Sequence, residues 1–299
     1  MEVSPQEFRD VQTLVRTLCG LVLTDDKTYL VSTRLEPVVK SHGCKTFAEY
    51  LGRLQQSHAI AMRDELVEAL TTGETSFLRD VHPFNEFRRQ ILPALAEIIR
   101  RRIAERHPAP LARIWSAGCS TGQEPYGLAM CMFEFLSANP ACGLRPGHFP
   151  ILATDVSGAS LNIAKEGRYS ERDMDRGIPT EMRSRYFMPQ GTSWTIRSDL
   201  KKCVEFRRLN FIDRVTNLGP FEVIFCRNVL IYFDLPTRQR LCEQFHQLLS
   251  PGGLLIVGAA ESLYGLNTPF QSELVGTTTV YRKTQPDSSH GLATTERTN

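Results

Sequence analysis

The chain has 299 residues and a formal net charge of +2, with 41% hydrophobic and 23% charged residues. This balance is typical of a soluble globular protein and gives no electrostatic case for nucleic-acid binding. No apolar run approaches the about 18 residues of a membrane span, the N-terminus is unlike a signal peptide, and the length predicts one large domain plus a smaller one.

Apolar residues recur at helical spacing near the N-terminus, at Phe8, Val11, Leu14, Val15 and Leu18. Ser4 followed by Glu7 is a capping signal for this helix. Further helical patterns cover Tyr29–Val39, Thr46–Leu54 and Ala59–Leu70. Together these patterns predict an all-α N-terminal domain over residues 1–80.

A polar cluster, TTGETSFLRD at residues 71–80, precedes a long helical pattern over Pro83–Arg106. We expect this helix to act as a linker between two domains, over residues 81–107. Its outer face is rich in arginine, including Arg100 to Arg102. Such a face is usually just solvated, and the alternative is a docking surface for an acidic partner. The polar cluster is either an ordinary linker or a cover for a ligand at the domain junction.

From residue 111 strands and helices alternate, which predicts a parallel α/β sheet in a domain over residues 108–283. The expected strands are Leu111–Ala117, Phe149–Asp155, Val204–Leu209, Phe221–Cys226 and Gly253–Gly258. The expected helices are Glu124–Leu136, Ser157–Lys165 and Pro236–Leu249, with a closing hairpin over Phe270–Arg282. This order is the outline of a doubly wound methyltransferase sheet.

Residues 168–202 interrupt this alternation with short strand patterns separated by polar turns. The patterns are Tyr186–Met188, Ser193–Arg197 and Cys203–Phe206. They predict a small antiparallel β-subdomain inserted at about residues 184–206. The last stretch, residues 284–299, lacks apolar periodicity and is expected to be a disordered tail.

The stretch WSAGCSTGQEPY, Trp115 to Tyr126, joins the first of these strands to its helix. Gly118 and Gly122 remove Cβ atoms where the chain turns and a ligand comes close, and Glu124 opens the helix. The sequence matches neither a P-loop nor the GxGxxG pattern of dinucleotide sites. An acid behind the loop suits S-adenosylmethionine, which carries a sulfonium and no phosphate; the alternative is a turn that binds nothing.

In a doubly wound sheet, ligands bind outside the carboxyl ends of the strands. The expected strands end at Gly118, Asp155, Asn210–Phe211 and Arg227–Asn228, and Tyr232 follows the last of these. Asp155 could accept both ribose hydroxyls, or it could cap the following helix. The asparagines could be turn residues, and Tyr232 could be a core residue with a satisfied hydroxyl. Four such strand ends together favour a ligand site over a chance set.

Eight cysteines are scattered along the chain without a CxxC pair. This spacing argues against a zinc ribbon and a disulfide framework, so we expect no metal site and a reducing cytoplasm. Cys119 and Cys226 lie beside the proposed pocket, but a nucleophilic role is disfavoured because no histidine partner is evident.

Five motifs, WSAGCSTGQEPY, TGETSFLRD, ATDVS, EGRYS and FCRNVLIYFD, together resemble those of the chemotaxis receptor methyltransferases, the CheR family. The resemblance extends from about residue 5 to residue 282. It implies an all-α N-terminal domain and a doubly wound α/β, class I S-adenosylmethionine-dependent methyltransferase domain with a small antiparallel β-subdomain inserted. The implied enzyme is a cytoplasmic protein-glutamate O-methyltransferase. It would convert glutamates on a chemoreceptor's cytoplasmic coiled coil to methyl esters and release S-adenosylhomocysteine.

The resemblance also implies roles for the matching residues. The implied cofactor contacts are Thr75 and Arg79 from the linker side and Glu124 at the methionine or sulfonium end. Asp155 would bind the ribose, Asn210 and Phe211 the adenine, and Arg227 and Asn228 would close the pocket beside the Gly118 loop. Gly73 stands where the family often has asparagine, which leaves only a backbone contact there.

A glutamate carboxylate is already ionised at neutral pH, so its methylation needs no general base, and orientation supplies most of the rate. Arg79 could pair with the acceptor carboxylate, and the Tyr232 hydroxyl could orient the acceptor or the sulfonium. We expect these two residues to be the catalytic ones.

In the family, the inserted subdomain can bind a C-terminal pentapeptide tether carried by some receptors. Members that do so have a longer Gly-rich turn than PQGTSW at residues 189–194. We therefore expect activity without the tether. The expected protein is a monomer whose partner is the chemoreceptor, with no nucleic acid and with membrane contact only through the receptor.

Two other functions stay open. A nucleic-acid methyltransferase shares the sheet but usually carries a [DNS]PP[YF] tetrapeptide after the fourth strand, where this chain has FCRNVLIYF. A non-catalytic regulator that senses the cofactor and binds the receptor would keep every motif.

Overall fold

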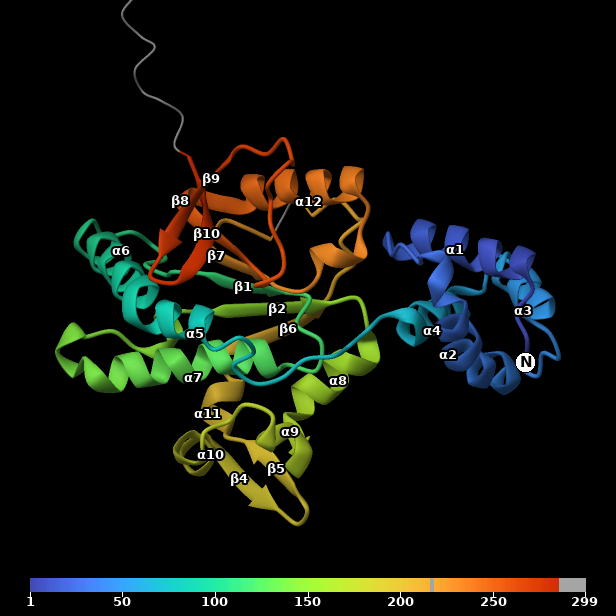
Figure 1. Ribbon diagram of the computed structural model, residues 1–299. Helices are drawn as coiled ribbons and strands as arrows, with labels where there is room; N and C mark the ends of the chain where they lie inside the picture. The colour runs from blue at the N-terminus through green and yellow to red at the C-terminus, as the bar shows by residue number, and fades with distance from the viewer. Residues whose placement is uncertain (216–217, 285–299) are drawn as a thin grey trace, which may run out of the picture.

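A computed structural model describes residues 1–215 and 218–284 and shows a helical N-terminal part beside an α/β part (Figure 1). The expected tail, residues 284–299, lies outside the described residues except for Thr284. Within the described ranges, every helix is too short or too polar to cross a membrane. The N-terminal helices are α1 (Pro5–Cys19), α2 (Thr28–Ser41), α3 (Phe47–Leu54) and α4 (Ile60–Leu70). The sequence prediction of four helices here is confirmed.

The start of α1 follows from local hydrogen bonding. The Ser4 hydroxyl accepts the backbone N–H of Glu7, and the Glu7 carboxylate accepts the backbone N–H of Ser4, which is a capping box. The helix ends at Gly20, whose φ of 77° is left-handed. Apolar side chains from all four helices form one buried core.

The joining helix runs without a gap from His82 to Ala104, close to the predicted Pro83–Arg106, but one turn within it is π-helical. Helix α5 (His82–Glu86) runs into a π-helical turn (Phe87–Ile91) and then α6 (Leu92–Ala104). Pro93 explains the widened turn, because it cannot donate to the carbonyl four residues earlier and its ring crowds that carbonyl. Arg102 is not on a solvated face, since its guanidinium binds the Leu111 carbonyl and the buried Glu222 carboxylate.

The α/β part contains a seven-stranded sheet in the order β6-β2-β1-β7-β8-β10-β9. Its strands are β1 (Ile114–Ala117), β2 (Ile151–Asp155), β6 (Val204–Arg208), β7 (Phe221–Cys226), β8 (Leu249–Val257), β9 (Phe270–Val275) and β10 (Thr278–Lys283). The first five strands in this order are parallel, and β10 is antiparallel to both β8 and β9. The predicted doubly wound sheet with a closing hairpin is confirmed, and its topological switch point lies between β1 and β7.

Helices cover both faces of this sheet, as Figure 1 shows with α12 above it and α7 below. The helices are α7 (Gln123–Ala138), α8 (Gly158–Glu166) and α12 (Leu235–Leu248). Alternate residues of each strand face opposite sides, so Ile114 packs in the core under α7 and α6, whereas Trp115 packs in the core under α12. This two-sided burial explains the continuous apolar runs of the strands.

A second sheet, in the order β3-β5-β4, forms the inserted β-subdomain. Its strands are β3 (Arg168–Ser170), β4 (Phe187–Gln190) and β5 (Ser193–Ile196), accompanied by α9 (Glu171–Asp175), α10 (Thr180–Tyr186) and α11 (Ser198–Lys201). The prediction that Cys203–Phe206 is a third strand of this subdomain is wrong. Val204 pairs in parallel with Ile151, so this segment is the edge of the main sheet, and Tyr169 pairs with Trp194 in its place.

Candidate functional site

A cavity of about 1010 Å³, counted with its open mouth, lies at the carboxyl edge of the main sheet. It is bounded by the strand ends on one side and by the helical N-terminal part and the segment after α4 on the other. The structure brings all eleven predicted site residues to this one cavity: Gly73, Thr75, Arg79, Gly118, Glu124, Asp155, Asn210, Phe211, Arg227, Asn228 and Tyr232. What each residue contacts in a bound ligand stays a prediction.

The loop between β1 and α7 forms the floor of the cavity. Gly118 has a φ of 82°, and a Cβ there would lie 2.4 Å from a methyl group of Val229, so any side chain would collide with the loop after β7. The backbone N–H groups of Gly118 and Cys119 both donate to the Thr154 carbonyl, at 2.8 and 2.9 Å. These two bonds fix the turn against the end of β2.

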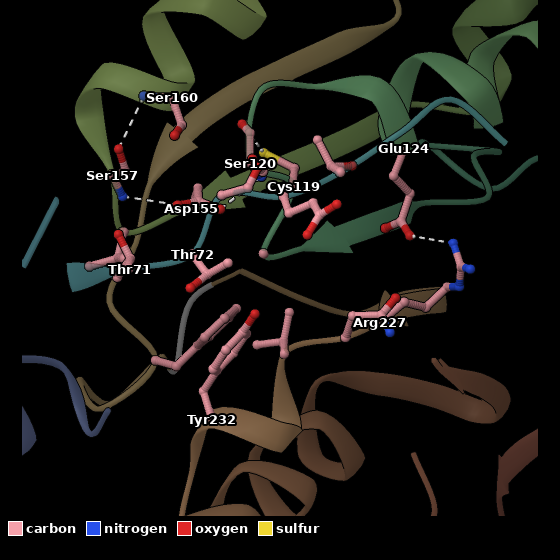
Figure 2. Close-up of a pocket in the computed structure, with 18 of the residues that line it drawn as sticks. Thr71, Thr72, Cys119, Ser120, Glu124, Asp155, Ser157, Ser160, Arg227 and Tyr232 are labelled. Atoms are coloured by element: carbon pink, nitrogen blue, oxygen red, sulfur yellow. Dashed lines mark hydrogen bonds and ion pairs between the residues drawn. The ribbon is translucent and has the colours of Figure 1, made fainter. Parts of the chain in front are cut away.

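Glu124 and Arg227 form a buried ion pair at one end of the cavity (Figure 2). One Glu124 oxygen lies 3.0 Å from the Arg227 guanidinium, and the other accepts the Ser116 hydroxyl at 2.8 Å. The Arg227 side chain is only 2% exposed and also binds the Asp80 carboxylate at 2.8 Å and the Arg79 carbonyl at 2.6 Å. Its Nε has no partner among the described residues. This cluster joins β7, α7 and the segment before α5.

Asp155 ends β2, and both of its carboxylate oxygens accept backbone N–H groups, from Ser120 at 2.8 Å and Ser157 at 2.9 Å. Burial raises the pKa of Asp155, and these backbone hydrogen bonds oppose the rise. The alternative reading, that Asp155 caps the following helix, is wrong because the Ser157 side chain is the N-cap of α8. The rigid hold on Asp155 is suited to presenting a carboxylate to a ligand.

Asn210 connects the cavity to the N-terminal helices. Its amide donates to the Leu18 carbonyl at 2.6 Å, and the backbone N–H of Val22 donates to the Tyr232 carbonyl at 2.9 Å. The end of α1 and the segment that follows it therefore supply part of the cavity wall, through Cys19 and Leu21. This wall could not be predicted, because no residue type near residue 20 indicates a ligand site.

The segment after α4 covers the cavity. The Gly73 carbonyl accepts the Ser120 hydroxyl at 2.7 Å, which pins this segment to the β1–α7 loop. Arg79 lines the cavity and donates to the Glu74 carbonyl at 3.3 Å. Leu78, Asp80 and Val81 all have positive φ angles, between 46° and 65°. Three non-glycine residues in this conformation are a local strain of the kind that collects at ligand sites.

Several further residues line the cavity that were not among the predicted site residues. They are Cys19, Leu21, Thr71, Thr72, Glu74, Ser76, Cys119, Ser120, Val156, Ser157, Ser160, Val229 and Phe233. Thr71, Thr72, Glu74 and Ser76 belong to the polar cluster at residues 71–80, which lines the cavity and is not an ordinary linker; that it covers a bound ligand stays a prediction. Burial raises the pKa of the Cys119 thiol well above its usual value, and the same holds for Cys226, which disfavours a thiolate nucleophile.

The charges of the cavity suit a ligand with a cationic end. Three carboxylates, those of Glu74, Glu124 and Asp155, line it against two guanidinium groups and no lysine among the described lining residues. One of the two cations, Arg227, already contacts two carboxylates. This arrangement fits a nucleoside that carries an ammonium or a sulfonium better than it fits a polyphosphate.

Comparison with known proteins gives matches along nearly the whole chain. Residues 73–279 match the family model described as CheR methyltransferase, SAM binding domain, and residues 6–71 match that described as CheR methyltransferase, all-alpha domain. The chemotaxis protein methyltransferase Cher2 of Pseudomonas putida is 36% identical over 272 residues, 91% of this chain and 95% of the relative. Chemotaxis protein methyltransferase 1 of Pseudomonas aeruginosa is 37% identical over 283 residues, 94% and 99%. The chemotaxis protein methyltransferase of Escherichia coli is 34% identical over 275 residues, 90% and 89%.

Proposed function

The chain belongs to the CheR family of S-adenosylmethionine-dependent chemotaxis methyltransferases, and from that premise we propose that it methylates glutamate side chains on the cytoplasmic coiled coil of a chemoreceptor. The observation that supports this most is the single cavity lined by every residue expected to hold cofactor or acceptor. We also propose domains over residues 1–80 and 108–283 joined by a linker over 81–107, and a monomer that reaches the membrane only through its receptor.

The lining residues fit S-adenosylmethionine. Asp155 would accept the ribose hydroxyls, Phe211 and Asn210 would bound the adenine, and Glu124 would face the cationic end. Gly118 has no Cβ, which lets the loop before α7 lie directly against Val229 in the loop after β7. When bound, the cofactor supplies a methyl group on a sulfonium, which an acceptor oxygen takes in one displacement while the bonding electron pair returns to sulfur.

The protein's own residues would then act by placing the acceptor. Arg79 is the guanidinium in the cavity that has no carboxylate partner among the described residues, so it is free to pair with an acceptor glutamate. The Tyr232 hydroxyl lies across the cavity from Asp155 (Figure 2) and could fix the attack angle. Because the acceptor is already ionised, neither residue needs to take a proton.

The transfer itself is the direct test. The purified protein, receptor-rich membranes and cofactor with a tritiated methyl group should give base-labile label on the receptor. A Gly118→Ala variant, whose new Cβ would collide with Val229, is the matched inactive control. Receptor that stays unlabelled would contradict the proposal and favour the non-catalytic regulator, and label on nucleic acid would favour the other alternative.

The edge of the β-subdomain supports independence from a peptide tether. The Tyr186 carbonyl accepts the Arg197 N–H at 3.0 Å, so by the antiparallel alternation the backbone groups of Phe187 and Pro189 point away from β5. Pro189 has no N–H to offer an added strand, and a proline on an edge strand is a common protection against strand addition. Strand β3, at the other edge, is only three residues long.

A pentapeptide of the NWETF type should therefore show no saturable binding at micromolar concentrations. Calorimetric titration measures this, with S-adenosylhomocysteine as a positive control on the same sample. Micromolar or tighter binding would show that the tether is used after all.

The raised pKa of Asp155 predicts opposite effects of acid on cofactor binding and on stability. Cofactor affinity should fall as pH decreases through the raised pKa, because the protonated carboxyl loses an acceptor for the ribose. The folded protein binds this proton more tightly than the unfolded chain does. The contribution of Asp155 to the free energy of unfolding should therefore increase as the pH falls through the raised pKa. Titrations of S-adenosylhomocysteine at several pH values measure the first effect, and thermal melts measure the second.

An Asp155→Asn variant is the control for this prediction, since it should bind more weakly and lose this part of the pH dependence. An unchanged Kd in the variant would remove Asp155 from the ribose site.

A further inference from the structure

One carboxylate outside the cavity holds the loop that follows β7. The Glu261 side chain accepts four backbone N–H groups: Asn228 at 2.6 Å, Val229 at 2.9 Å, Ile231 at 3.2 Å and Gly258 at 2.7 Å. Glu261 follows β8, and its own backbone N–H donates to the Gly258 carbonyl at 2.9 Å, so the side chain folds back over a tight turn. It is not one of the residues that line the cavity.

The held loop needs an external acceptor. Asn228 has a φ of 57°, a left-handed turn conformation that asparagine tolerates better than most residues with a side chain, as its alternative as a turn residue predicts. The 3₁₀ turn that follows it, Leu230–Tyr232, begins without a side-chain cap, so its first N–H groups have no partner inside the turn. Glu261 supplies these missing acceptors from the neighbouring strand end.

The turn after β8 is built closely around this contact. A Cβ on Gly258 would lie 2.7 Å from the Glu261 carboxylate and 2.9 Å from the Asn228 backbone nitrogen. A side chain at residue 258 would therefore collide with both the carboxylate and the loop that it holds. Asn228, Val229 and Tyr232 in the held loop all line the cavity.

From this geometry we infer that Glu261 is a positioning residue for methyl transfer, acting through Tyr232. It sets the backbone from which the Tyr232 side chain reaches into the cavity, without itself contacting cofactor or acceptor. The expected effect on the methyl-transfer rate rests on the proposed function, whereas the expected loosening of residues 228–232 does not. A displacement of about 1 Å at a positioned group can lower a rate by about 100-fold.

Glu261→Gln is the discriminating variant. Glutamine has nearly the same shape as glutamate, but an NH₂ group replaces one of the two carboxylate oxygens. This NH₂ group would face two backbone N–H groups and could accept a hydrogen bond from neither. The expected kcat is about 10- to 100-fold lower. In a Tyr232→Phe background, Glu261→Gln should lower kcat by less than about threefold. The Tyr232 hydroxyl through which Glu261 acts is already missing there, so little is left for the second substitution to remove. A purely stabilising role of Glu261 predicts instead that the two effects multiply.

A matched control and a second readout keep the inference separate from the activity. Glu273→Gln removes another carboxylate from the same end of the chain, one that pairs with Arg282 away from the loop, and should leave kcat unchanged. Hydrogen exchange should become faster in residues 228–232 of Glu261→Gln and stay unchanged in α7. Provided that the wild type transfers methyl groups, three results would each overturn the inference. They are a normal kcat in Glu261→Gln, effects of the two substitutions on kcat that multiply, and an unchanged hydrogen-exchange rate in residues 228–232. Failure of the wild type to transfer methyl groups would instead overturn the proposed function.

Discussion

Replacing Arg227 with alanine should lower the free energy of unfolding by about 3–5 kcal/mol, the usual effect of removing one partner of a buried ion pair. The guanidinium is 2% exposed and contacts Glu124 and Asp80, of which the Glu124 side chain is only 12% exposed. Without the cation, Glu124 keeps a single hydrogen bond, from Ser116, in a site that water reaches poorly. Chemical denaturation with a two-state fit measures the loss.

Cofactor affinity should fall in the same variant. Arg227 also holds the Arg79 carbonyl, so its removal releases the strained segment that covers the cavity.

Two further variants separate the effect of the buried charge on stability from the effect of packing. Arg207→Ala, which breaks the exposed pair with Glu205, should change stability by less than about 1 kcal/mol. The double variant Arg227→Met with Glu124→Gln should recover much of the lost stability, since both buried charges are then gone. No recovery would mean that the cluster stabilises the fold by its shape rather than its charge.

Replacing Arg79 with alanine should lower kcat by about 100-fold, the scale seen when a group that orients or stabilises charge at the reacting atoms is removed. The Kd for S-adenosylhomocysteine should change much less, because Arg79 makes its described hydrogen bond to the Glu74 carbonyl and leaves the rest of its guanidinium for the acceptor. Methyl-transfer rates at saturating cofactor and receptor, compared with calorimetric Kd values, give both quantities.

Arg79→Lys is the informative companion, since it keeps the charge but loses the two-pronged geometry that matches a carboxylate. It should recover only part of kcat. Normal turnover in Arg79→Ala would remove the residue from catalysis, and a large rise in Kd with kcat unchanged would make it a cofactor contact alone.

The sequence was sufficient to place the strand ends. Parallel strands end at the same edge of a sheet, so Gly118, Asp155 and Arg227 could be brought together from their positions in the alternation alone. The same alternation predicted the sheet and its closing hairpin, and the capping pattern at Ser4 predicted where the chain's first helix begins. These features depend on the local spacing of residues, and few sheet topologies are compatible with this order of strands and helices.

Contacts made through the backbone could not be predicted. The Leu18 carbonyl binds Asn210 and the Gly73 carbonyl binds Ser120, and a carbonyl leaves no trace in the residue type. Glu261 was missed for the related reason that its partners are four backbone N–H groups, mostly some 30 positions away along the chain. The segment Cys203–Phe206 shows a further limit. Its short alternating pattern fits the edge of either sheet, so the sequence predicted it both as part of the main-sheet strand Val204–Leu209, which is confirmed, and as a strand of the subdomain, which is wrong.

The wall that α1 and the segment after α4 contribute to the cavity has a consequence for how the protein can be regulated. The contacts that join the helical part to the α/β part include Leu18–Asn210, Val22–Tyr232, Gly73–Ser120 and Asp64–Arg208. A ligand that fills a cavity with two such walls strengthens their docking, and thermodynamic reciprocity requires docking to tighten the ligand by the same factor. By the same reciprocity, a protein that binds better when the helical part is undocked would weaken ligand binding, so ligand affinity would be a property of the complex rather than of this chain alone.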